Sequence, residues 1–204
     1  MRRLRRATRD THGSPEAGLT LIEVVVAMTV LSIFMAMFTS GMLQMYRTVN
    51  KNESQSTAQS EINALFLRLD REVRYAAGIS DAGAVGADQY VEYLITNTGT
   101  PTCVELRLSA VDGQIQRRTW LHDQTPTRPT GWVPLASAVT AATPFERVAP
   151  TDTYQFQRLR LRMSVSSGGA DTATAKETDI TFTALNTNPD TKSSSVCTEG
   201  RTIP

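Results

Sequence analysis

One carboxylate stands at an unusual place in this sequence. Glu23 lies at the start of a long apolar run, and residues 24–46 contain no charge. An ionisable group near the centre of a bilayer costs about 2.5–3.5 kcal/mol on insertion scales, so such a residue usually has a partner or a function. Gly18 and apolar Leu19 come directly before this run, and five arginines precede them: Arg2, Arg3, Arg5, Arg6 and Arg9. This combination predicts a membrane-inserted segment in which Glu23 has a specific role.

The two cysteines, Cys103 and Cys197, are the other residues with chemistry of their own. Two is the smallest number that can form a disulfide, and a disulfide persists only in an oxidising compartment. A Cys103–Cys197 bond is the interpretation we prefer, and two free thiols are the alternative. The two histidines, His12 and His122, are far apart in sequence, so we expect no histidine-rich metal site.

The apolar run extends from Leu19 to Tyr46. Its charge-free part would form a helix roughly 34 Å long, which suffices for a hydrocarbon core of about 30 Å. A conventional signal peptide would be cut after the apolar core, where only Thr39, Ser40 and Gly41 are small. Neither such a peptide nor a plain uncleaved anchor explains Glu23.

The stretch Gly18-Leu19-Thr20-Leu21-Ile22-Glu23 resembles the prepilin cleavage and methylation motif of type IV pilins and type II secretion pseudopilins. In that family a prepilin peptidase cuts after the glycine and N-methylates the new first residue. A glutamate occupies the fifth mature position, which here is Glu23. Phenylalanine usually follows the cut, so Leu19 departs from the family pattern.

The resemblance implies a structural role for the chain, without a cofactor and without catalysis. Its partners would be the peptidase, other pilin or pseudopilin subunits, the inner-membrane assembly platform and the membrane itself. Basic residues remain on the cytoplasmic side, so the leader would face inward and the rest would be translocated. After the cut, the amino group of one subunit could pair with Glu23 of another. Such a pair is strong in apolar surroundings, and its loss is costly.

The remainder of the chain predicts an α+β fold, in which a long N-terminal helix packs on an antiparallel β-sheet domain. Apolar residues from Ala58 to Val73 recur at steps of three and four, as on one face of a helix. We expect this helix to stop at Gly78, with a possible interruption between Asn50 and Gln59. The expected segments are a leader (1–18), a transmembrane or filament-core helix (19–46), its amphipathic continuation (47–78), a β-rich domain (79–188) and a polar tail (189–204).

Alternating and broken apolar patterns predict five strands: Gln89–Thr96, Cys103–Ala110, Gln114–Leu121, Tyr154–Ser166 and Thr178–Leu185. Apolar and charged residues alternate around Glu105, as in a half-buried strand with its charges outside. Asp112-Gly113 predicts a hairpin turn. Five of the nine prolines lie between Thr125 and Pro150, which predicts a long loop or an excursion at a sheet edge.

Two other classes of function compete with a filament subunit. One is a membrane-anchored binding module that does not polymerise, and the other is a secreted enzyme. The sequence has no Gly-rich phosphate loop and no Gly-x-Ser-x-Gly elbow, and Asp171, Glu177 and Asp179 do not follow a known calcium-loop spacing. Without its basic leader the chain is slightly acidic, so the charge balance predicts no direct binding of nucleic acid.

A second, weaker resemblance concerns Leu67–Ala76, which is similar to the helix of J-type minor pseudopilins and related minor pilins. The major pilins' usual proline, about twenty residues into the mature helix, is also missing, since Ser40 and Gly41 occupy that region. Both points favour a minor subunit, with a large major pilin as the alternative.

Overall fold

The computed structural model describes residues 18, 20–97, 99–166, 175–194 and 196–203. It divides into two compact units, Met1–Thr48 and Val49–Pro204. The first contains the beginning of helix α1 (Leu21–Arg74), and the second contains the rest of α1 together with all the strands. The expected α+β fold, a long apolar helix with antiparallel sheets, is what the structure shows.

The part of α1 in the second unit is amphipathic, as its spacing predicts. Its buried side chains are Ile62, Leu65, Leu69 and Val73, and they recur at steps of three and four. Residues 50–59 are helical throughout, so the interruption does not occur. The helix ends at Arg74 and not at Gly78, because Gly78 is already paired in strand β1.

The strands form two antiparallel sheets. The strands of sheet A are β1 (Ala76–Ile79), β2 (Gly83–Val85), β3 (Asp88–Ile95), β4 (Thr102–Ser109), β5 (Gln114–Leu121) and β6 (Val133–Ala136). Those of sheet B are β7 (Val139–Thr140), β8 (Phe145–Val148), β9 (Arg158–Ser166) and β10 (Ala175–Thr183). The proline-rich segment is therefore not only a loop, because it supplies β6 at the edge of sheet A and two short strands of sheet B.

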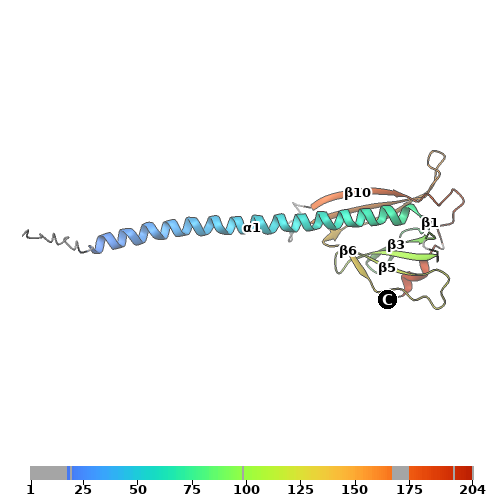
Figure 1. Ribbon diagram of the computed structural model, residues 1–204, viewed down its shortest axis with the longest axis horizontal. Helices are drawn as coiled ribbons and strands as arrows, with labels where there is room; N and C mark the ends of the chain where they lie inside the picture. Colours follow the sequence, from blue (N-terminus) through green and yellow to red (C-terminus); the bar gives the residue numbers. More distant parts are fainter. Residues whose placement is uncertain (1–17, 19, 98, 167–174, 195, 204) are drawn as a thin grey trace, which may run out of the picture. The chain divides into compact units, whose positions relative to one another are not determined.

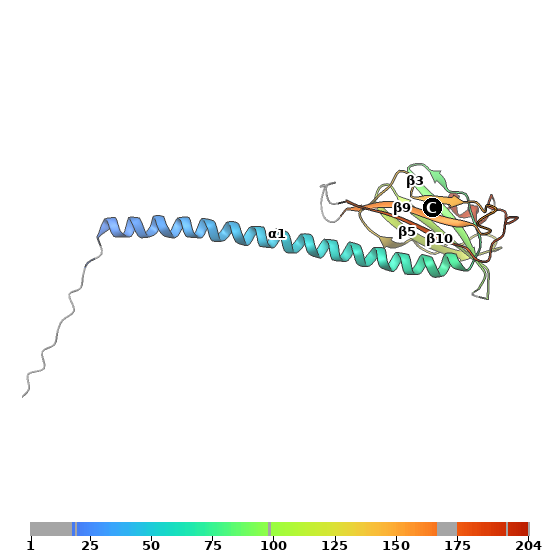
Figure 2. The ribbon, with the colours of Figure 1, turned by 90° about the horizontal axis from the view of Figure 1, so that it is seen from above.

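One apolar core joins α1 to both sheets. Figure 1 shows the green end of α1 between β10 and the strands β3, β5 and β6, and Figure 2 shows β9 and β10 side by side from above. Phe66 of α1 contacts Phe182 of β10 with ring centroids 5.6 Å apart. On the other side, the Tyr93 hydroxyl donates to Glu72 at 2.6 Å. Burial and the negative charge of Glu72 raise the pKa of Tyr93 well above its ordinary value.

The far face of sheet A carries a row of buried charges instead of solvent-exposed ones. Glu92, Glu105 and Arg118 lie directly opposite one another on β3, β4 and β5. Glu105 is fully buried, so the expectation that its side of β4 faces water is wrong. The Arg118 guanidinium forms an ion pair with Glu105, and that of Arg201 forms one with Glu92. Each charge is buried with a partner of opposite sign, as burial requires.

Residues 197–203, which we call the strap, cover this face. The strap contains the 3-10 helix η2 (Thr198–Thr202) and is drawn in red near β3 and β5 in Figure 1. Arg118 donates to the carbonyl oxygens of Gly200, at 2.8 Å, and Ile203, at 2.6 Å. The expected polar tail is thus an integral part of the domain.

Candidate functional site

The start of α1 is built by a local capping arrangement. The backbone N–H of Glu23 donates to the Thr20 hydroxyl oxygen at 3.4 Å and to the Thr20 carbonyl oxygen at 3.1 Å. A hydroxyl residue with a glutamate three positions later is the pattern of a capping box. The Glu23 carboxylate also lies in the first turn, where the helix dipole favours a negative charge. This cap was not predicted from the sequence, although Thr20 and Glu23 have the spacing that indicates it.

Gly18 is exposed and precedes the helix. A Cβ atom added at Gly18 would have no atom of the described residues within 4 Å. Leu19, the expected first mature residue, and the arginines of the leader lie outside the described residues.

The apolar part of α1 is uncovered within its own unit. Large apolar side chains from Leu21 to Val49 are exposed, each by 41% or more. An 18-residue window of α1 has a mean hydropathy of 2.4, so this helix is long and apolar enough to cross a membrane. The hydroxyls of Thr29 and Ser32 donate to carbonyl oxygens within the helix, each at 2.8 Å. These two hydroxyls are therefore satisfied within the helix, as an apolar environment demands.

Glu23 itself is exposed, and its carboxylate forms no ion pair with any residue that the structure describes. The nearest charged residues along α1 are Arg47 and Lys51, six helical turns or more away. Any cation that neutralises Glu23 in an apolar setting must come from outside the described part of this chain.

The second pair of candidate residues does come together. Cys103 of β4 and Cys197 at the start of the strap form a disulfide, with Cα atoms 5.7 Å apart. Both sulfurs are buried beside Trp120. The disulfide links two positions separated by 94 residues, which holds the strap against β4.

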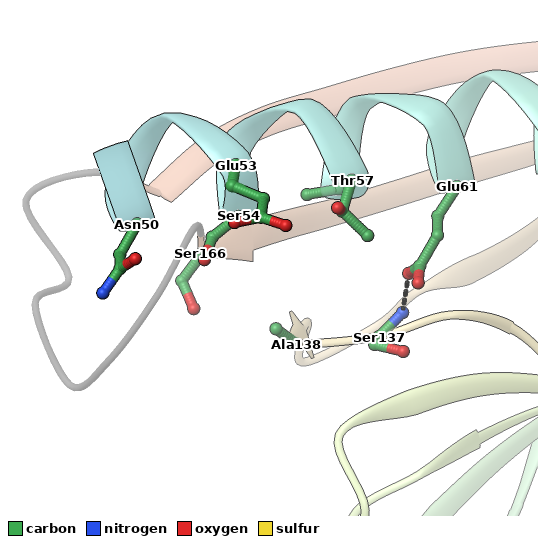
Figure 3. Close-up of a pocket in the computed structure, with 9 residues that line it drawn as sticks. Asn50, Glu53, Ser54, Thr57, Glu61, Ser137, Ala138 and Ser166 are labelled. Atoms are coloured by element: carbon green, nitrogen blue, oxygen red, sulfur yellow. Dashed lines mark hydrogen bonds between the residues drawn. The ribbon is translucent and has the colours of Figure 1, made fainter. Parts of the chain in front are cut away.

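An open hollow of about 460 Å³ lies between α1 and the segment after β6 (Figure 3). Its lining residues are Asn50, Glu53, Ser54, Thr57, Ala58, Glu61, Ser137, Ala138 and Ser166. The Glu61 carboxylate accepts a hydrogen bond from the backbone N–H of Ser137 at 2.8 Å. Among the described residues, the lining offers carboxylates and hydroxyls but no histidine, lysine or cysteine.

Comparison with known proteins agrees with the N-terminal motif. Residues 13–39 match the family described as the prokaryotic N-terminal methylation motif. No curated protein and no solved structure matches the chain. The matched segment contains Gly18, Thr20 and Glu23 and continues into the uncovered apolar part of α1. This prepilin-type motif supports the type IV pilin-like family for the chain, a family of structural proteins processed by prepilin peptidase.

Proposed function

We propose that this chain is a structural minor subunit of a type IV pilus or of a type II secretion pseudopilus. A prepilin peptidase cuts between Gly18 and Leu19 and methylates Leu19. The subunit waits in the inner membrane with its sheet domain on the outer side, and it enters the filament through α1. The observation that carries this proposal is that the matched methylation motif, residues 13–39, extends into the exposed apolar part of α1.

Glu23 would act in assembly by pairing with the amino terminus of a neighbouring subunit. Within the described residues its carboxylate has no cation to neutralise it. The free amino group made by the cut has a reference pKa of about 7.7–8.0, so it is largely charged at neutral pH. Pairing the two groups removes two costly charges from an apolar filament core.

Peptide sequencing of the membrane-extracted protein tests the processing step. The mature chain should begin at Leu19 and carry a methyl group on its amino nitrogen. Replacing Gly18 by Leu should leave an uncut precursor, because a bulky side chain at the cut would obstruct the peptidase. A mature chain that begins near Gly41 would instead identify a conventional signal peptide.

A charge-removing substitution tests the assembly step. Glu23→Gln keeps the size and shape of the side chain but removes its charge. We expect normal cleavage and a loss of at least about tenfold in the amount recovered from sheared filaments, since 1.4 kcal/mol corresponds to a factor of ten. Glu53→Gln, on the exposed part of the same helix, is the matched control and should assemble normally. Recovery of both variants from sheared filaments in equal amounts would contradict the proposed pairing.

The minor role rests on the proline-rich segment and the likeness of Leu67–Ala76 to J-type subunits. In the structure this segment contributes β6, β7 and β8 and makes an added edge on each sheet. A subunit repeated thousands of times must accommodate these edges at every position of the helical filament. A subunit at the filament tip has no such constraint.

A further inference from the structure

Three potential metal ligands converge where the strap meets β4. Cys103 Sγ, Cys197 Sγ and a carboxylate oxygen of Glu199 all lie within 4.8 Å of one another. Glu199 Oε1 is 3.8 Å from Cys103 Sγ. In a tetrahedral zinc site, with Zn–S near 2.3 Å and Zn–O near 2.1 Å, a sulfur and an oxygen ligand lie about 3.6 Å apart. The carboxylate thus already stands at the distance from Cys103 that a shared zinc ion would set.

The strap does not depend on the disulfide alone for its position. Arg201 forms an ion pair with buried Glu92, and its Nε donates to Glu92 Oε1 at 2.6 Å. Arg118 donates hydrogen bonds to the carbonyl oxygens of Gly200 and Ile203. These contacts all follow Glu199 in sequence, at Gly200, Arg201 and Ile203. They anchor the strap directly after Glu199 without using the sulfur–sulfur bond.

Trp120 also orients the Glu199 carboxylate beside the two cysteines. The indole N–H of Trp120 donates to Glu199 Oε1 at 2.9 Å. Groups that hold a ligand by a hydrogen bond typically change metal affinity by 10- to 100-fold when they are removed. The two cysteines are buried and Glu199 is exposed, so the group is open to solvent on the carboxylate side.

We propose that the reduced form of this chain binds one zinc-like divalent cation through Cys103, Cys197 and Glu199. A dithiol supplies two electrons and two protons to the disulfide and itself becomes a disulfide. The two thiols formed each lose a proton as the cation binds. Three protein ligands leave a fourth position for water. Oxidation removes both thiolates, so the disulfide and the metal are alternative ways to fix the strap on β4.

Cobalt(II) titration of the full chain in detergent micelles tests the proposal. The chain is reduced with dithiothreitol, which is then removed without oxygen, and the thiols are counted by alkylation and mass spectrometry. We expect one Co²⁺ per reduced chain, with the visible bands of a tetrahedral site and a thiolate charge-transfer band, and displacement by Zn²⁺. The oxidised chain should show neither band.

Matched variants decide which residues form the site. Glu199→Gln should weaken Co²⁺ binding by at least about tenfold, as expected when a group at a metal site is lost. Glu177→Gln, an exposed acid on β10, should bind like the unchanged protein. Equal affinities for these two variants would overturn the three-ligand site. So would the absence of stoichiometric binding, or a loss of β-sheet circular dichroism on reduction alone, because the site requires a strap that stays in place.

Discussion

The buried charge row on sheet A allows a sharp test of how the domain is held together. Arg118→Met removes the cation but keeps an unbranched side chain beneath the Trp132 ring, whose centroid lies 4.1 Å from the guanidinium carbon. The substitution leaves Glu105, which is fully buried, without the ion pair that neutralises it. It also removes the donors to the strap carbonyls of Gly200 and Ile203.

The expected loss is large because a buried charge is left uncompensated. Removing one partner of a buried ion pair costs about 3–5 kcal/mol. Replacing both partners by apolar residues is often nearly neutral, so Glu105→Met combined with Arg118→Met should recover about 2 kcal/mol or more. The recovery is incomplete, because each strap carbonyl still lacks its donor and an unsatisfied buried group costs about 1–3 kcal/mol.

The stability lost by Arg118→Met should also depend on pH in a defined direction. Burial raises the pKa of Glu105 above its ordinary value, and the hydrogen bond and charge of Arg118 lower it. Without Arg118, burial and the charge of Glu92 still raise this pKa and only the weaker effect of the Arg201 charge opposes them, so it rises further. A carboxyl with a raised folded-state pKa stabilises the fold below the unfolded value of about 4.3 and loses that stability as pH rises through the folded pKa. The Arg118→Met deficit should therefore shrink toward acid pH.

Urea unfolding followed by tryptophan fluorescence provides the measurement. Both tryptophans lie at this face, Trp120 beside the disulfide and Trp132 over Arg118, so their emission reports on the strap and the row together. The free energy of unfolding would be compared at pH 4 and pH 7 for the single and double variants. A single variant that loses less than about 1 kcal/mol, or a double variant as unstable as the single one, would refute the reasoning.

Two further predictions concern packing and stoichiometry. Gly200→Ala places a Cβ against the Trp120 ring, so it should destabilise the domain by about 1–3 kcal/mol in the same urea assay, and an unchanged midpoint would contradict the contact. Quantitative mass spectrometry of purified filaments should find this subunit far below the most abundant pilin, and a stoichiometric excess over all other pilins would require the minor role to be withdrawn.

Helix α1 and the fold class could be predicted because their signals are local. The apolar run, the steps of three and four from Ile62 to Val73, and the Gly18–Glu23 motif are all readable over a few turns. The end of α1 was predicted less accurately, because pairing between Gly78 and Leu94 of β3 overrides a local stop signal. Such a pairing partner cannot be identified from the glycine itself.

The outer face of sheet A could not be predicted for the same reason. A charged residue at alternate positions of β4 predicts exposure, and only the register with β3 and β5 reveals that Glu105 faces Glu92 and Arg118. The cover comes from residues 197–203, whose polar composition predicts a solvated tail. Their burial follows from specific partners for Arg201 and Cys197, which no periodicity encodes.

The long sequence separation between sheet A and the strap affects how the protein is made. Strands β3, β4 and β5 are synthesised well before residue 197 follows. Until then Glu92 and Cys103 lack their partners, and the row of charges is covered by no strap. A chain interrupted before this point would leave Glu92 without its ion pair and Cys103 as a free thiol. Completion of the domain thus removes two features that would distinguish a truncated chain from a finished one.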